Sequence, residues 1–287
     1  MELKIAAMVL LSAALHPLWN AMIKREKRID GAFIGMVTLL MFTSFSHATI
    51  MGYDLLSVAQ VWPLIALSVA GQLLYGISLI RTLGHGDLSV YYPIIRSSPL
   101  FIVIVGLLFL GESYTPQLLV GIACVLIGAF VLQYRRGSHI FHDPKTMFIA
   151  LLAMSGTGIY SIADARAMQA IEPPVLFFWV EASSLPVYIF VYRFFGLPGT
   201  RLPDLFSWTK KPLLFLGLAA ICYSSYWLIL TAYGMGGDVA AVTSVRQASI
   251  PISVILGGLM FREGSIVRRL IASLVLAGGI VGVVLAG

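Results

Sequence analysis

Residues 86–112 read GDLSVYYPIIRSSPLFIVIVGLLFLGE, and residues 237–263 read GDVAAVTSVRQASIPISVILGGLMFRE. With a constant shift of 151 residues, the two stretches are identical at eight positions. Each is an apolar helix about long enough to span a bilayer. Each also holds an interior arginine followed by a proline, which are Arg96 and Pro99 in the first stretch and Arg246 and Pro251 in the second. A repeat of this length predicts that the chain consists of two similar halves.

The composition predicts an integral membrane protein. Of the 287 residues, 59% are hydrophobic and 11% are charged, whereas a soluble domain carries about 25% charged residues. The formal net charge of +6 is attributed to the loops of a membrane protein rather than to nucleic-acid binding. Cys124 and Cys222 lie inside apolar runs and are interpreted as small core residues. No metal or cofactor is expected.

The hydropathy of the chain predicts an all-α integral membrane protein with ten transmembrane helices. Their expected limits are 3–23, 31–51, 61–83, 88–111, 116–134, 146–168, 173–194, 212–234, 238–261 and 266–286. The loop at 135–145 separates two groups of five, so we expect one repeat at 1–137 and a second at 138–287. An odd number of helices per repeat inverts the second repeat, and many secondary transporters hold such inverted repeats around a central cavity.

The basic residues are divided unevenly between the two expected membrane surfaces. Of the 19 lysines and arginines, fifteen follow odd-numbered helices, and only Lys4 and Arg166 lie on the other side. Basic loops remain in the cytoplasm. The pattern therefore predicts a multi-pass protein of the cell inner membrane, with cytoplasmic loops at 24–30, 135–145 and 195–211 and with both termini outside.

Polar residues inside the expected helices predict a binding site. A charge at this depth costs roughly 3 kcal/mol on insertion scales, so it usually faces a cavity or a partner. With a rise of about 1.5 Å per residue, Arg96 and Arg246 each lie about 12 Å from a helix end, near the middle of the membrane. Guanidinium groups match carboxylates and phosphates, so Arg96 is expected to hold an anionic group of the substrate. The predicted substrate-binding residues are Arg96, Arg246, Tyr92, His16, Trp19, Asn20, Tyr160, Trp179 and Gln247.

The acidic residues leave two interpretations open. Glu181 and Asp164 are candidates for carrying a coupling proton. Alternatively, Glu181 pairs with Arg246 as a structural bridge, while Arg96 binds backbone carbonyl groups. The alignment of the repeats sets Gln247 opposite Arg96, and an offset of one residue turns a side chain about 100° around a helix. The two arginines are therefore not strict symmetry mates. His47 is interpreted as a hydrogen-bonding residue between helices.

The doubled five-helix unit, with its prolines, its repeat ends LGE (110–112) and FRE (261–263) and its Gly-rich fifth helices, resembles the drug/metabolite transporter superfamily of the EamA type. The resemblance covers nearly the whole chain. It implies ten helices in a basket around a central cavity, alternating access, and export or exchange of small metabolites. Over LHPLWNAMIKR (15–25) and IIRSSP (94–99) alone, the chain also resembles a branch sometimes associated with phosphonate use. Members of the superfamily usually have cytoplasmic termini, whereas the loop charges here favour the outside.

Together these observations predict a secondary transporter, an exporter or exchanger, for a small anionic or zwitterionic metabolite such as an amino acid. The expected partners are that small molecule and membrane lipid, without nucleic acid, and the chain is expected to be a monomer or homodimer. An enzyme is disfavoured because no HExxH, GxSxG or P-loop motif occurs in the sequence. A flippase for a lipid-linked sugar and a small multidrug exporter remain as alternatives, although interior arginines disfavour cationic drugs.

Overall fold

The computed structural model describes residues 1–24, 26–85, 91, 94–133, 143–195, 201–252 and 266–286. Over these residues the chain is helical and contains no strand. The long elements are α1 (Leu3–Lys24), α2 (Ile29–Met51), α3 (Trp62–His85), α6 (Pro116–Gln133), α7 (Pro144–Ala167), α8 (Pro173–Phe195), α10 (Pro212–Gly234) and α13 (Ile266–Ala286). The short ones are η1 (Leu55–Gln60), α5 (Ser98–Val105), η2 (Gly106–Leu110), α9 (Leu202–Leu205), η3 (Ser207–Lys210), α11 (Val239–Val245) and η4 (Arg246–Ala248).

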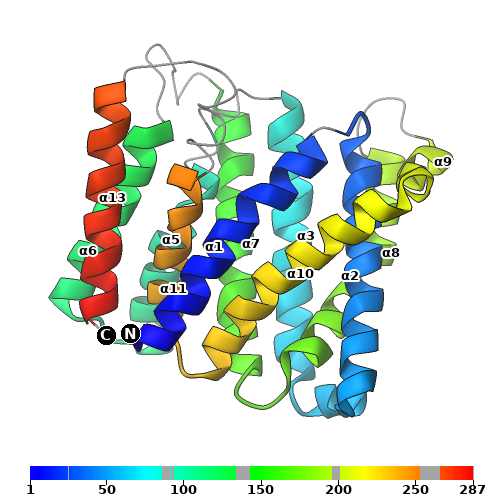
Figure 1. The fold of residues 1–287 in the computed structure, drawn as a ribbon, viewed down its shortest axis with the longest axis horizontal. Coiled ribbons are helices and arrows are strands. Elements are labelled where there is room, and N and C mark those ends of the chain that lie inside the picture. Colours follow the sequence, from blue (N-terminus) through cyan, green and yellow to red (C-terminus); the bar gives the residue numbers. More distant parts are fainter. Residues whose placement is uncertain are drawn as a thin grey trace.

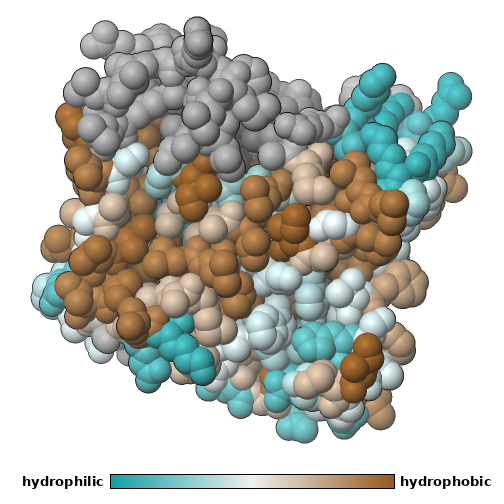
Figure 2. Space-filling model, in the orientation of Figure 1, coloured by the Kyte–Doolittle hydropathy of each residue, from teal (hydrophilic) through white to brown (hydrophobic). Residues whose placement is uncertain are grey.

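The described helices form an all-α membrane protein. Helices α2, α7, α8 and α10 and residues 62–79 of α3 are long and apolar enough to cross a bilayer, and shorter apolar helices accompany them. Large apolar side chains face outward, including Ile50 at 82% exposure and Leu213 at 83%. Figure 2 shows this apolar surface as a broad belt, with hydrophilic residues gathered above and below it. Such a belt suits contact with lipid rather than with water.

Within the described residues, most predicted helix limits agree with the structure to a few residues, and those at 212–234 and 266–286 agree fully. The segment expected to be a helix at 88–111 is broken at Arg96, which lies in a turn just before α5. In the segment expected at 238–261, α11 tightens to the 3₁₀ turn η4 at Arg246, and the helix resumes at residues 249–252. Pro99 lies in the first turn of α5, where its missing N–H breaks the hydrogen-bond ladder to the preceding turn.

Glycine lets two helix pairs approach closely, as the sequence predicts for a membrane bundle. A Cβ atom on Gly71 of α3 would lie 2.9 Å from the carbonyl oxygen of Gly156 on α7. A Cβ atom on Gly279 of α13 would lie 2.8 Å from the carbonyl oxygen of Gly121 on α6. The α1–α10 pair uses side chains instead, because Ser12 and Ser225 are hydrogen-bonded at 3.1 Å.

The two ends of the bundle differ in charge. At one end, Arg28 pairs with Asp204 at 3.1 Å and Lys211 pairs with Glu26 at 2.9 Å, which ties the α1–α2 loop to the segment between α8 and α10. The two chain termini meet at the other end, where the amino group of Met1 donates to the carbonyl oxygen of Val284 at 2.8 Å (Figure 1). Acidic residues predominate in the described loops of that end, where Asp54, Glu112, Glu172 and Asp238 lie.

Two connectors pack against helices that lie far away in the sequence. Trp179 on α8 donates from Nε1 to the carbonyl oxygen of Leu55 in η1 at 2.8 Å. In the other connector, Trp208 of η3 covers Gly35 on α2 so closely that a Cβ atom there would lie 2.4 Å from its ring. Each connector therefore holds the first part of a helix that belongs to the other half of the sequence.

Candidate functional site

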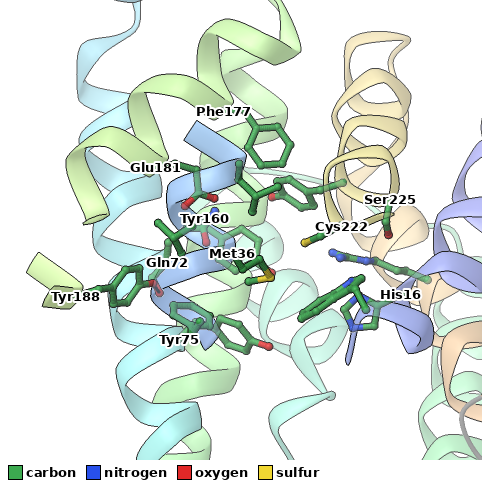
Figure 3. A pocket seen from close by; sticks show the side chains of 16 residues that line it. His16, Met36, Gln72, Tyr75, Tyr160, Phe177, Glu181, Tyr188, Cys222 and Ser225 are labelled. Atoms are coloured by element: carbon green, nitrogen blue, oxygen red, sulfur yellow. Dashed lines mark hydrogen bonds between the residues drawn. The ribbon is translucent and has the colours of Figure 1, made fainter. Parts of the chain in front are cut away.

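A central cavity with about 670 Å³ of empty space lies among α1, α2, α3, α7, α8, α10 and η4. Figure 3 shows Glu181, Tyr160 and Tyr75 on one side and His16 and Ser225 on the other. The empty space includes open solvent at the mouth of the cavity, so it is an upper limit on the room for a ligand. The lining residues therefore say more about the site than its volume does.

Aromatic rings form much of the cavity wall. Tyr160 lies edge-on to Tyr75 at 6.1 Å and to Tyr226 at 6.2 Å, and Phe177 lies edge-on to Tyr226 at 5.3 Å. The guanidinium carbon of Arg246 lies 5.4 Å from the centre of the Tyr226 ring. A cation over an aromatic face is stabilised by the ring quadrupole, and this contact orients the guanidinium group within the aromatic wall.

A second, smaller cavity with about 420 Å³ of empty space shares several lining residues with the first. His16, Tyr75, Tyr160 and Arg246 line both cavities. Arg96 lines the smaller one. The two arginines predicted from the repeat therefore meet at one small polar chamber beside the aromatic cavity.

Arg96 is tied directly to the second interrupted segment. Its Nη2 donates to Ser249 Oγ at 2.6 Å, and its backbone carbonyl accepts from Gln247 Nε2 at 2.9 Å. Gln247 is the residue that the repeat alignment sets opposite Arg96. The alternative interpretation of Arg96 had its guanidinium group bonded to backbone carbonyls. In the structure its Nη2 atom donates instead to a serine hydroxyl.

Several buried polar atoms of the small chamber lack a hydrogen-bond partner within the part of the chain that the structure describes. They are His16 Nδ1, Arg96 Nε, Arg246 Nε and Gln247 Oε1. His16 is 7% exposed and lies edge-on to Trp19 at 4.9 Å. A buried donor without a partner costs about 1–3 kcal/mol, so two guanidinium N–H groups and an imidazole nitrogen here are suited to binding a polar ligand.

The acidic residues occupy different positions. Glu181 is 6% exposed and lines the central cavity. Among the described residues, no ion pair joins it to Arg246, so the structural bridge between them does not form. Asp164 is fully buried behind the aromatic wall, where its carboxylate accepts hydrogen bonds from the hydroxyls of Ser68 and Tyr226.

The structure brings together most of the predicted substrate-binding residues. Those that line one cavity or both are Arg96, Arg246, His16, Trp19, Tyr160 and Gln247, and Glu181 joins them. Trp179 lines neither of these two cavities and lies at the η1 connector, where its indole donates to a carbonyl group. Tyr92 and the side chain of Asn20 lie outside the described residues. His47 joins α2 to α10 through a 2.7 Å hydrogen bond with Tyr223, as predicted.

The set of predicted substrate-binding residues did not include Tyr75 and Tyr226. Both lie well inside long helices, and both line the central cavity. Aromatic residues in membrane helices usually belong to the interfacial belt or to packing. Their distance from the helix ends, where the belt lies, was the signal that could have identified them.

A separate polar pocket with about 810 Å³ of empty space opens at the end of the bundle that holds the termini. Glu112, Tyr114, Arg166 and Asp238 line it. Burial raises the pKa of the Tyr114 hydroxyl to about 12, with further contributions from Asp238 and Glu112. Burial also raises the pKa of Asp238. Backbone N–H groups that donate hydrogen bonds to its carboxylate lower that pKa, but burial has the larger effect. Arg166 is the one basic residue of its described lining, whereas two arginines line the small chamber.

The fold is similar to that of known proteins. One solved structure, described only as the crystal structure of a protein, matches with a TM-score of 0.76 and 17% sequence identity, over 98% of this chain and 97% of its own. At that identity the similarity shows the fold alone. No protein-family model matches the chain, and no curated protein matches it.

Proposed function

We propose that this protein is a secondary transporter that moves a small anionic or zwitterionic metabolite, such as an amino acid, across the cell inner membrane by alternating access. The observation that carries the proposal is the meeting of the two repeated segments at one cavity. The first segment is broken at Arg96 and the second tightens to a 3₁₀ turn at Arg246, and each arginine has a buried Nε atom without a hydrogen-bond partner among the described residues. Interrupted helices near the middle of the membrane are where many secondary transporters bind their substrates.

Each of the two cavities is expected to bind a different part of the substrate. Arg246 and Arg96 bind its anionic group in the small chamber, where forked guanidinium donors match a carboxylate. The body of the substrate lies against Tyr75, Tyr160 and Tyr226. Glu181, across the cavity, is placed to accept hydrogen bonds from an ammonium group. A zwitterion therefore satisfies more of the lining than a simple anion does.

The proposed architecture is ten membrane helices in two inverted repeats of the drug/metabolite transporter type. Helix packing supports it, because α3 packs on α7 while α10 packs on α1, and exchanging the two halves interconverts these pairs. The pairs α2–α8 and α6–α13 each join equivalent helices. The two connectors support it as well, since each crosses to the second helix of the other half.

The proposed orientation places the basic end in the cytoplasm and both termini outside, although the superfamily usually has cytoplasmic termini. The charge difference between the two ends supports this choice. Labelling of a Ser138→Cys variant with an impermeant thiol reagent tests it, with Cys124 and Cys222 replaced by serine. Labelling of intact cells from the outside would show that the orientation is reversed.

The transport proposal is tested first by binding. The purified protein is heated with separate amino acids, organic acids and phosphonates, because a ligand of the folded state raises the unfolding temperature. L-Phenylalanine is the first probe, since its ring matches the aromatic wall and its zwitterion matches Arg246 and Glu181. Compounds that stabilise the protein are then tested for counterflow, the exchange of labelled for unlabelled compound across vesicle membranes.

Arg96 variants give the proposal a direct control. We expect no counterflow with Arg96→Ala and partial counterflow with Arg96→Lys, because lysine keeps the charge and loses the fork. Both variants must unfold at a temperature close to that of the wild type. Full counterflow by Arg96→Ala would remove Arg96 from the site. Tightly bound lipid, with no stabilisation by any soluble compound, would favour a flippase instead.

A further inference from the structure

We propose that Asp164 is the proton-binding site of this protein and that it exchanges its proton with the central cavity through the hydroxyl group of Tyr226. The inference rests on the proposed transport function, and it adds the identity of the coupling ion and of the residue that carries it. Three features of the structure support it: the hydrogen bonds of Asp164, the position of Tyr226, and the position of Arg246.

The first feature is a fully buried carboxyl group whose two oxygens both bind hydroxyls. Asp164 is on α7, one turn before the helix ends at Ala167, and it is 0% exposed. Ser68 on α3 donates to one oxygen, and Tyr226 on α10 donates to the other. No ion pair within the described part of the chain neutralises it.

Hydroxyl partners are compatible with both protonation states of the carboxyl group. A serine or tyrosine hydroxyl donates to a carboxylate, and after rotation of its O–H it accepts from a carboxylic acid. An arginine or a backbone N–H group could only donate, and would hold the group in its charged form. Asp164 can therefore gain or lose a proton without leaving a buried polar atom unsatisfied, which would otherwise cost about 1–3 kcal/mol.

The second feature is a route for the proton. Tyr226 lines the central cavity, whereas Asp164 lies behind it and lines neither cavity. When Tyr226 gives its hydroxyl proton to the Asp164 carboxylate, its oxygen accepts a proton from a hydronium ion in the cavity. The O–H bond of Tyr226 is broken and re-formed, one O–H bond forms at Asp164, and hydronium is left as water. Release follows the reverse order.

The third feature couples this proton to the substrate. The guanidinium group of Arg246 lies over the Tyr226 ring. The other ionisable groups whose electrostatic influence links them to Asp164 are Glu181 on α8 and Tyr233 on α10, and Tyr160 on α7 lies close enough to influence Tyr226. Tyr75 faces the same wall from α3. Arg246 is the one cation among these groups, and it lies against the ring whose hydroxyl donates to Asp164. An anion bound to Arg246 would neutralise that positive charge and so favour a proton on the Tyr226–Asp164 pair. Substrate and proton therefore bind together and move in the same direction.

Glu181 does not share these features. It faces the central cavity directly and makes no hydrogen bond with another described residue. Its position suits contact with the substrate rather than storage of a proton behind a hydroxyl relay. The two carboxyl groups can therefore be separated by experiment.

The first test needs no substrate. Infrared spectra of the full-length protein in detergent are recorded over a series of pH values, and the carbonyl-stretch band of buried carboxylic acid is followed. We expect one pH-dependent component that is lost in Asp164→Asn and retained in Glu181→Gln. Tyr226→Phe and Ser68→Ala should shift that component to another pH. If Asp164→Asn retains every pH-dependent component, or the band does not titrate, Asp164 is not the proton site.

The second test separates coupling from transport, with L-phenylalanine or another compound that passes the binding screen. In vesicles, Asp164→Asn should keep counterflow and lose the accumulation that a pH gradient drives in the wild type. Tyr226→Phe should slow that accumulation at least about 10-fold, while Tyr223→Phe, on the same helix but bonded to His47, should leave it unchanged. Gradient-driven accumulation by Asp164→Asn would overturn the inference. If the wild type shows no counterflow, the transport function is refuted instead, and the infrared result still stands.

Discussion

Arg96 and Arg246 occupy the same part of the two repeated stretches, yet their surroundings differ. Arg96 lies in a turn before α5, bonds to Ser249, and lines only the smaller cavity. Arg246 begins η4, lies over the Tyr226 ring, and lines both cavities. The difference shows that one arginine is held by the opposite segment, whereas the other lies against an aromatic ring and lines both cavities.

Under the proposed function, this asymmetry has a mechanistic meaning. In a transporter with inverted repeats, two halves of similar sequence that adopt different local structures can exchange those structures, and the exchange would open the site to the opposite side. The hydrogen bonds between Arg96, Gln247 and Ser249 join the two interrupted segments. They are therefore contacts that the exchange must alter. The following predictions change the surroundings of Arg96 or those of Arg246 while leaving the other arginine's surroundings in place.

The largest effect is expected at Arg246. Arg246→Ala should weaken binding of the screened substrate at least about 100-fold, because charge-assisted hydrogen bonds contribute about 1.5–3 kcal/mol and the proposed binding mode gives the arginine more than one to the substrate. Arg246→Lys should also lose most counterflow, since lysine cannot stack flat on Tyr226. Arg96→Lys should retain part of it. Equal tolerance of lysine at both positions in counterflow assays would show that the two regions act alike.

The sequence predicted the helices and the polar residues more successfully than it predicted which side of each helix faces the cavity. A membrane helix is apolar on the side that faces lipid and on the side that faces other helices. Leu213 is 83% exposed and Phe215 is 1% exposed, although both are large apolar residues of α10. Trp19 and Trp179 were both predicted to bind substrate, but only Trp19 lines the cavity. The two arginines, which were predicted from their depth in the membrane, both line a cavity.

The helix breaks were the second feature that the sequence did not predict. Pro99 and Pro251 were visible beyond each arginine, but prolines within membrane helices often cause only a kink. Whether the segment continues depends on neighbours that satisfy the freed backbone groups. Gln247 supplies such a neighbour by donating to the carbonyl of Arg96, and this contact depends on the packing of two distant segments.

A smaller effect is expected when the packing of α7 against α5, the helix that follows Arg96, is made too tight. A Cβ atom on Gly158 of α7 would lie 2.2 Å from the ring of Phe101 on α5. Gly158→Ala should therefore displace α5 and cost about 1–3 kcal/mol of stability. Gly217→Ala is the matched control, because no atom lies within 4 Å of its added Cβ. The unfolding temperature in detergent measures both, and an equal change in the two variants would contradict the assigned packing.

A still smaller effect is expected when the hydrogen bond between Gln247 and the Arg96 carbonyl is removed. Gln247→Leu deletes the hydrogen bond to the Arg96 carbonyl, which contributes about 0.5–1.5 kcal/mol. Substrate binding, measured by calorimetry, should weaken by about 2- to 12-fold. Gln169→Leu is the control, since Gln169 makes the same kind of bond to the carbonyl of Tyr233 at 3.1 Å, away from both cavities. Weaker binding in the control alone would remove Gln247 from the site.

The smallest effect concerns the cap of α11, the helix that leads to Arg246. Asp238 accepts a hydrogen bond from the amide of Ala241, and burial raises its pKa above the ordinary value of 3.8. The folded protein therefore binds this proton more tightly than the unfolded chain does. Its contribution to the free energy of unfolding rises as the pH falls through the raised pKa, and is complete below 3.8.

Asp238→Asn keeps an acceptor for the cap and removes the titration, so the variant should lack this gain in unfolding temperature at acidic pH. Asp143, the cap of α7 at the other end of the bundle, supplies a control of opposite sign. Hydrogen bonds from Thr146 are the main cause of its lowered pKa, so stability is present above 3.8 and lost as the pH falls through the folded-state value. Asp143→Asn should therefore remove an acid-induced loss rather than a gain. If both variants shift the pH profile of unfolding in the same direction, the burial of Asp238 is not what sets the stability of the helix that presents Arg246.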